Sequence, residues 1–213
     1  MPQDSTSITV RQIWHQAWSN ARFRKMSIAG LIIAVTILSF FPFFFRTIEE
    51  RHGIVLNDPI LRWLPAYNVS IPLFIIIWAL TILAIVRSVQ HPRMCLTFIW
   101  SFILLSLFRM LTITLVPLDA PAGLIGLVDP LSNAFYGDRF VTKDLFFSGH
   151  TSTVFLLTLC LPGKTDKRLG LVVTFGVAFL LLVQHVHYTM DVLAGFLFGW
   201  MAWWITTRMI VRD

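Results

Sequence analysis

The strongest constraint on the fold of this chain is a series of six apolar stretches, at about 27–45, 70–86, 94–118, 148–162, 169–186 and 190–210. Each is long enough, or nearly so, to cross about 30 Å of hydrocarbon as a helix. Only 13% of the residues are charged, whereas soluble domains average about 25%. The sequence therefore predicts an all-α integral membrane protein with six transmembrane helices.

The predicted domain organisation is simple. Residues 27–213 form one six-span domain, and residues 1–26 form a cytoplasmic segment that carries Trp14, Trp18 and several cations. This composition is typical of an interfacial amphipathic helix, although a frayed tail fits equally well. Cys95 and Cys160 lie inside apolar stretches without ligand spacing, so we expect neither a disulfide framework nor a cysteine metal site.

Charge sets the predicted orientation. An excess of Lys and Arg marks cytoplasmic segments. One side of the six spans holds eleven such residues and the other side five, with Arg109 left inside the third span. Both termini are therefore predicted to be cytoplasmic, and the loops at about 46–69 and 119–147 to lie on the extracytoplasmic face. The net charge of +6 then reflects topology and anionic lipid headgroups, and we expect no nucleic-acid partner.

Three polar groups interrupt the apolar pattern. Arg109 is a charged residue within a span, where such residues usually face a cavity or a partner; a snorkelling or ion-paired arginine is the alternative. Ser148-Gly149-His150 begins the fourth span. There a Ser cap, a Gly that admits a ligand and free helix amides would form an anion site beside a proton-transferring His.

The third polar group, His185-Val-His187-Tyr-Thr-Met-Asp191, lies between the last two spans. If the segment is helical, His187 and Asp191 share one face, and the carboxylate can orient the imidazole as a nucleophile or base requires. A polar turn at the membrane surface is the alternative. Zinc is disfavoured because two imidazoles lack further ligands. The predicted topology brings all three groups to one membrane surface, which indicates a phosphoryl-transfer site without metal or other cofactor.

These motifs resemble the type 2 phosphatidic acid phosphatase (PAP2) superfamily and, more closely, its sphingomyelin synthase branch. The resemblance rests on Leu107-Phe108-Arg109, on Asp144-x3-Ser148-Gly149-His150-Thr151, on His185-x-His187-Tyr-Thr-x-Asp191-Val and, more loosely, on Asp58-Pro59. It implies a PAP2-like helical bundle and an enzyme that acts on membrane lipids.

Two departures from the phosphatase pattern are informative. Nothing fits the Lys-x6-Arg-Pro motif, and Leu181 stands where the phosphatases carry an Arg six residues before the second histidine. Losing these cations weakens binding of a dianionic phosphomonoester more than that of a phosphodiester. The sequence therefore favours transfer of a phospholipid headgroup.

The resemblance also implies the roles of the residues. His187 would attack phosphorus, held by Asp191, and His150 would transfer protons. The substrate would be bound by Arg109 and the amides near His150, with Lys143 and Arg139 as weaker helpers. Asp144 would contact a cationic headgroup or orient His150. Further candidates for substrate binding are Ser148, Gly149, His185 and Asp58.

The implied donor is a phospholipid, and the acceptor is a lipid such as ceramide or a diacylglycerol-like molecule. Outer-loop aromatic residues could cage a choline-like ammonium or act as interfacial anchors; they are Trp63, Phe135, Tyr136, Phe140 and Phe147. A lipid phosphatase is the nearest alternative function, and a non-catalytic membrane scaffold is a more distant one. The sequence does not indicate an oligomeric state.

Overall fold

The computed structural model describes residues 9–127 and 141–211. Its elements are α1 (Val10–Ser19), α2 (Ala21–Glu50), α3 (Pro59–Trp63), α4 (Ser70–Gln90), α5 (Pro92–Leu115), α7 (Gly149–Cys160), α8 (Lys164–Val183), α9 (Thr189–Ile205) and a π-helix, η1 (Thr206–Ile210). Within these ranges there is no β-strand, and one isolated parallel bridge joins Ile54 to Leu118. The prediction of an all-α fold is confirmed.

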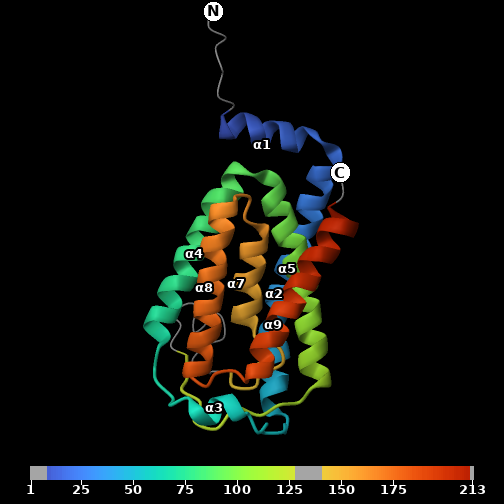
Figure 1. Cartoon of the computed structure of the whole chain (residues 1–213). Coiled ribbons are helices and arrows are strands. Elements are labelled where there is room, and N and C mark those ends of the chain that lie inside the picture. The colour runs from blue at the N-terminus through green and yellow to red at the C-terminus, as the bar shows by residue number, and fades with distance from the viewer. Residues whose placement is uncertain (1–8, 128–140, 212–213) are drawn as a thin grey trace, which may run out of the picture.

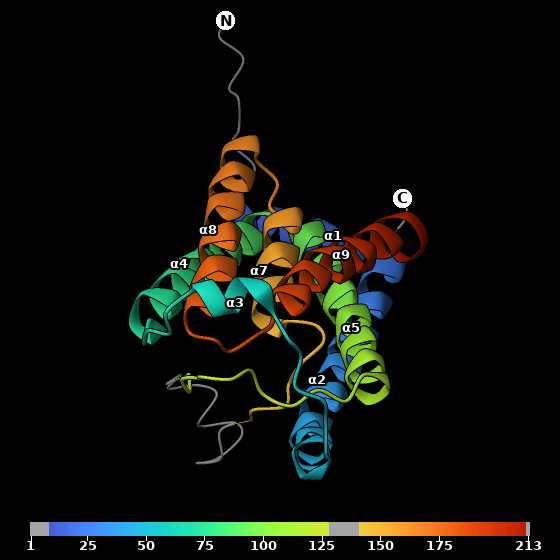
Figure 2. The ribbon, with the colours of Figure 1, turned by 60° about the horizontal axis from the view of Figure 1, so that its bottom comes forward.

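Six helices run along a bundle in alternating directions, in the order α2, α4, α5, α7, α8, α9 (Figure 1). α1 lies across one end of this bundle, where η1 also ends, and α3 lies at the opposite end (Figures 1 and 2). We call these the α1 end and the α3 end. The orientation of the two ends in a membrane stays a prediction.

Three of these helices, α2, α4 and α5, are long and apolar enough to cross a membrane. This supports an integral membrane protein. α7 has 12 residues, about 18 Å of helix, which is less than a bilayer core, so six complete spans stay a prediction. The predicted boundaries were too narrow for α2, which runs over Ala21–Glu50, and displaced for α8, which runs over Lys164–Val183.

Local sequence explains where several helices begin. The Asn20 side chain accepts hydrogen bonds from two amides of the first turn of α2, which ends α1 and starts α2. Ser148 caps α7 as predicted, with its Oγ accepting from Thr151 N at 3.3 Å. Asp58 caps α3, and Pro59 follows it at the first helical position, where its missing N–H costs nothing.

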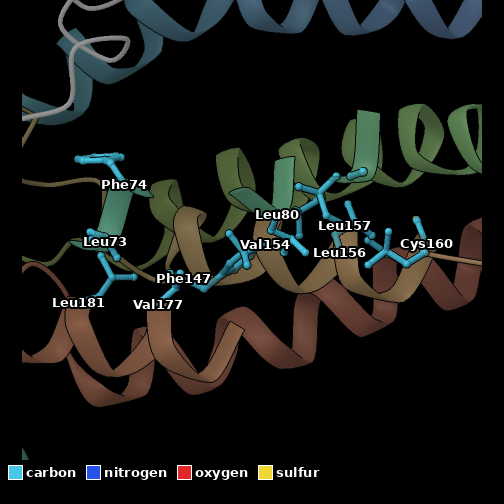
Figure 3. Packing of buried hydrophobic residues seen from close by; sticks show 14 of the residues in the cluster. Leu73, Phe74, Leu80, Phe147, Val154, Leu156, Leu157, Cys160, Val177 and Leu181 are labelled. Carbon is cyan, nitrogen blue, oxygen red and sulfur yellow. The ribbon is translucent and has the colours of Figure 1, made fainter. Parts of the chain in front are cut away.

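α7 lies at the centre of the bundle and packs against α4, α5, α8 and α9. Its buried Val154, Leu156 and Leu157 form a core with Leu80 of α4 and Val177 of α8 (Figure 3). The short central helix is thus held on several sides by longer ones, and its N-terminus opens towards the α3 end.

The seam between α7 and α9 is unusually close. Gly195 and Gly199 are four residues apart on α9, and a methyl group added at either would lie 3.2 Å from a carbonyl oxygen of α7, that of Ser148 or Ser152 respectively. Small residues at this spacing let two helix backbones approach in membrane proteins. The seam fixes the starts of α7 and α9 relative to each other.

Candidate active site

A cavity of about 340 Å³ opens at the α3 end of the bundle, between α2, α4, α5 and α7. Its polar lining includes Arg109, Asp144, Gly149, His150 and His187. Its apolar walls come from α2, α4, α5 and α7, with Leu38, Phe41, Ile77, Phe102, Leu105 and Leu157 among them. Phe102 precedes Arg109 by seven residues and Leu157 follows His150 by seven. Two helical turns of apolar wall therefore lie below the polar groups.

His187 and Asp191 form the most deeply buried polar pair of the site, with 3% and 0% of their surfaces exposed. His187 Nδ1 lies 3.5 Å from Asp191 Oδ2, which also accepts the Tyr188 N–H at 3.1 Å. The helical arrangement considered for this pair does not occur, because α9 begins only at Thr189. His187 lies in the preceding turn, and the helix cap brings the two groups together. With Nδ1 towards the carboxylate, Nε2 is the ring nitrogen left for chemistry.

A backbone hydrogen bond ties the two histidine-bearing segments together. Ser148 donates its N–H to the carbonyl of Asp191 at 2.9 Å. Ser148 precedes His150 by two residues, and Asp191 is the partner of His187. The His150 ring, which lines the cavity, stands edge-on to Phe74 of α4 with ring centres 6.1 Å apart. The catalytic candidates are therefore placed by the helix starts themselves.

Arg109 is almost completely buried, with 7% of its surface exposed. Its guanidinium binds the Asp144 carboxylate and donates to the Phe147 carbonyl at 2.8 Å. It also lies against Gly149, where an added methyl carbon would be 2.6 Å from Arg109 Cζ. The sequence suggested that Gly149 admits a ligand; in the structure, the group that makes this close approach is Arg109. The guanidinium thus sits at the N-terminus of α7, next to His150.

Two loops at the α3 end, one between α3 and α4 and the other after α5, hold the turn that carries His187. The His185 ring lies between the carbonyl oxygens of Ala122 and Leu64, at 3.0 and 2.9 Å. The fully buried Gln184 donates to Ser70 Oγ and to two further carbonyls of the second loop. His185 therefore fastens both loops to the end of α8, and its ring does not line the cavity.

Asp58 acts on the start of α9. Its carboxylate accepts the Thr189 N–H at 2.6 Å and the Thr189 hydroxyl at 3.1 Å. Partial burial alone would raise the pKa of Asp58, but the hydrogen bonds from Thr189, Leu61 and Ile60 lower it below the usual value. Asp58 lies outside the cavity lining and positions the residue between His187 and Asp191.

Lys143 is also turned away from the cavity. Its ammonium group binds the carbonyl of Arg51 and lies 3.0 Å from Asp119 Oδ1. The Lys143 hydrogen bond holds the pKa of Asp119 below its usual range, with further help from the Gly53 amide. The ammonium group thus has partners in the segments that follow α2 and α5.

The predicted site residues fall into three groups. Arg109, Asp144, Gly149, His150 and His187 line the cavity, and Asp191 and Ser148 lie directly behind this lining. The structure does not bring the other three candidates, His185, Lys143 and Asp58, into the lining, because each is engaged in contacts that join the loops at the α3 end. The chemical role of every member stays a prediction.

Of the five aromatic residues considered as a cage or as interfacial anchors, the structure describes two, and neither lines the cavity. Phe147 is fully buried, stacked on Phe198 and placed under Arg109, and Trp63 is 87% exposed outside the lining. Phe135, Tyr136 and Phe140 lie outside the described residues, as does the predicted helper cation Arg139.

Sequence reasoning missed Glu49, Gln184 and Tyr188, whose polar groups meet partners far away in the chain. Tyr188 accepts the Leu56 N–H and donates to the Asp119 carbonyl. A polar residue at a span end is the only signal that the sequence offers for such contacts. Among the described residues, no three His, Cys, Asp or Glu side chains gather as a metal site requires.

The family model described as PAP2 superfamily C-terminal matches residues 143–208. This range holds the catalytic candidates His150, His187 and Asp191 together with Ser148 and Gly149. It omits α2, α4 and Arg109. No curated protein matches the chain. The family match supports a PAP2-type membrane enzyme with phosphatase or phosphotransferase activity on lipids, in agreement with the resemblance seen in the sequence. The sphingomyelin synthase branch stays a prediction.

Proposed function

We propose that this protein is a membrane lipid phosphotransferase. It moves a phosphorylated headgroup, such as phosphocholine, from a phospholipid to a lipid acceptor such as ceramide, through a phosphohistidine on His187. The observation that carries the proposal is a single cavity in which two histidines and one guanidinium meet above an apolar wall. Such a cavity suits a substrate with a phosphoryl group at one end and hydrocarbon at the other.

In the first step, His187 Nε2 attacks phosphorus, so that a P–N bond forms and the bond from phosphorus to the glycerol oxygen breaks. His150 gives its proton to that oxygen, and diacylglycerol leaves. Asp191 stabilises the positive charge on His187 through Nδ1. The Asp191 carboxylate is fully buried, which strengthens this interaction because little water screens it.

In the second step, the acceptor hydroxyl gives its proton to His150 and attacks phosphorus. A P–O bond forms, the P–N bond breaks, and His187 is regenerated. Arg109 and the first amides of α7 stabilise the negative charge that grows on the phosphoryl oxygens. Their fixed positions at the cavity wall mean that they need no rearrangement as the charge develops.

The charge of the cavity favours a phosphodiester. Arg109 is the only Lys or Arg in its described lining, and the Asp144 carboxylate already offsets this charge. A phosphomonoester dianion would need more cations than this, whereas a phosphodiester carries one negative charge. Asp144 also offers a negative group for the cationic end of a zwitterionic headgroup.

We place this site on the extracytoplasmic face, in the orientation predicted from the distribution of Lys and Arg. The implied partners are the phospholipid donor, the lipid acceptor and the membrane itself.

The decisive experiment supplies the purified protein in liposomes with labelled phosphatidylcholine, phosphatidylethanolamine or phosphatidic acid, with and without ceramide, and follows the products by lipid mass spectrometry. We expect a headgroup-bearing sphingolipid only when ceramide is present. His187→Ala should abolish it, whereas His91→Ala, an exposed histidine at the α1 end, should leave the rate unchanged.

The same assay tests the second candidate function, that of a lipid hydrolase, which is considered because PAP2 enzymes include phosphatases. Diacylglycerol released together with free phosphate or a free phosphorylated headgroup, at a rate independent of ceramide, would show that water resolves the phosphohistidine. That outcome would overturn the proposed transfer reaction and retain the site.

A further inference from the structure

A carboxylate outside the cavity binds a segment of the chain that contributes to the cavity lining. Glu49, in the last turn of α2, accepts three hydrogen bonds from the 142–143 segment. Glu49 Oε2 accepts the N–H groups of Thr142 and Lys143 at 3.0 and 3.1 Å, and Oε1 accepts the Thr142 hydroxyl at 2.6 Å. The side chain thus binds two consecutive backbone N–H groups and the Thr142 hydroxyl.

The stretch that Glu49 holds is part of the cavity. Val141, Thr142 and Asp144 all contribute to the lining, and Asp144 binds the Arg109 guanidinium. Any movement of residues 142–143 therefore moves Asp144, which is the partner that fixes the phosphate-binding Arg109. Glu49 itself does not line the cavity.

Arg51, the residue that follows α2, reinforces this attachment. The Arg51 carbonyl accepts from the Lys143 ammonium, and the Arg51 guanidinium donates to the carbonyls of Thr114 and Val116 just beyond Arg109 on α5. The end of α2 is thereby joined both to the segment above the cavity and to the helix that bears Arg109. α2 also supplies Leu38 and Phe41 to the apolar wall.

We infer that Glu49 is a positioning residue for lipid binding: it clamps residues 142–143 to the end of α2, so that Asp144 holds Arg109 in the phosphate-binding position. This inference deepens the proposed function and rests on it. The clamp acts through hydrogen bonds more than through charge. A glutamine can still accept the two amides with its carbonyl and donate to the Thr142 hydroxyl, whereas an alanine can do neither.

The test compares four variants in the liposome assay: Glu49→Ala, Glu49→Gln, Thr142→Val and Glu50→Ala. Glu50 is the matched control, because it is the next residue of α2, exposed and paired only with the exposed Arg46 at 3.8 Å. Hydrogen exchange of peptides that cover residues 141–148 measures the clamp itself. Peptides from α7 and α9 report whether each variant is folded.

We expect Glu49→Ala to lower kcat/KM by about tenfold or more, mainly through KM, because three hydrogen bonds that preorganise the binding groups are lost. Thr142→Val, which removes one of them, should lower it by about threefold. Glu49→Gln and Glu50→Ala should stay within about twofold of the wild type. Hydrogen exchange of residues 141–148 should be faster in Glu49→Ala than in the wild type, but not in Glu49→Gln or Glu50→Ala. Exchange of α7 and α9 should be unchanged in all three variants.

Two results would overturn the clamp. One is a Glu49→Ala protein that keeps kcat/KM within twofold although its 141–148 segment exchanges faster. The other is an equal loss in Glu49→Gln and Glu49→Ala, which would assign the effect to charge. If Glu49→Ala does not fold, the test is the kcat/KM of Thr142→Val compared with that of Glu50→Ala. A value for Thr142→Val that is no lower than that for Glu50→Ala would overturn the clamp. If the wild type transfers no headgroup, the proposed function fails, and the exchange data alone decide whether the clamp exists.

Discussion

The central helix α7 and the helices α2 and α4 differ in how much they bury. In α2 only six of 30 residues are buried, and in α4 five of 21, whereas in α7 seven of 12 are buried, three of them Ser or Thr. α2 and α4 thus present most of their surface outwards and lend the cavity an apolar wall. The C-terminal half of the bundle, α7 to α9 with the turns before them, carries His150, His187 and Asp191, and it alone matches the PAP2 family model.

If the proposed function is correct, this contrast teaches that α2 and α4 contribute to hydrocarbon recognition alone, whereas the groups for phosphoryl chemistry lie on the other elements around the cavity. Helices that face lipid can adapt their side chains to lipid chains at little cost to stability, because surface substitutions rarely matter much. A reacting constellation must be held to within fractions of an ångström. Arg109 of α5 is the exception, since it is the one cavity-lining charge that the N-terminal half contributes.

The exception gives the largest expected effect. Arg109→Lys should lower kcat/KM by about a hundredfold, because a lysine ammonium is a compact charge on a flexible chain and lacks the planar, fixed donors with which the guanidinium binds Asp144 and the Phe147 carbonyl beside a phosphoryl oxygen. The measurement is headgroup transfer in liposomes, with Arg62→Lys as a control on an exposed arginine at the same end. Equal activity of the two variants would remove Arg109 from the site.

A smaller but still large effect should follow from Gly149→Ala. The new methyl group would collide with the Arg109 guanidinium. Overpacking of this kind lowers stability by about 1–3 kcal/mol, because the surrounding groups must shift. Because the displaced group is Arg109, we expect activity to fall about tenfold or more.

The matched control for Gly149→Ala is Gly176→Ala in α8, where the added methyl would meet only Ile76 Cδ1 at an ordinary 3.5 Å. This variant should be neutral or more stable by up to about 1 kcal/mol, because alanine favours the helix. Thermal unfolding in detergent and the transfer assay measure both variants. Similar behaviour of the two glycines would contradict the close approach of Arg109.

The apolar wall should show a moderate, selective effect. Ile77→Trp narrows the cavity from α4, and we expect KM for long-chain phospholipids to rise about threefold to tenfold with kcat nearly unchanged, since only binding is affected. Ile75→Trp, on the exposed side of the same helix, should behave as the wild type. A loss of kcat in Ile77→Trp would contradict the view that α4 contributes to substrate binding and not to the chemical step.

The smallest effect concerns the loops that join the halves. Because its folded pKa is lowered, Asp58 contributes stability that is fully present above its unfolded pKa of about 4 and is lost as the pH falls from that value through the lower folded pKa. Asp58→Asn should lower Tm by about 1–3 °C at pH 7. The difference from the wild type should shrink near pH 3, as thermal unfolding at both pH values can show.

The sequence predicted the parts of the site that depend on local chemistry. A Ser followed by Gly and His at the start of an apolar run indicates a capped helix, and a charged Arg within a span indicates a cavity, so Ser148, His150 and Arg109 could be found without coordinates. The order of apolar stretches likewise predicted the alternating helices and placed these groups at one end.

What the sequence could not predict depends on contacts between distant segments. His185, Asp58 and Lys143 look like binding residues because they are polar and lie beside the motifs. Each instead meets a backbone or side-chain partner more than 20 residues away. Loop conformations decide these pairings, and polarity alone carries no information about them. Glu49 went unnoticed for the same reason.

The glycine seam between α7 and α9 has a consequence for engineering. Because a methyl group at Gly195 or Gly199 would lie only 3.2 Å from the carbonyl oxygen of Ser148 or Ser152, α7 and α9 form one closely packed block, which a larger side chain at either glycine would push apart. The walls from α2 and α4 meet this block across a cavity and can be resculpted residue by residue. A designer who wishes to redirect the protein to other lipids should therefore build the mutant library in α2 and α4 and leave the block untouched.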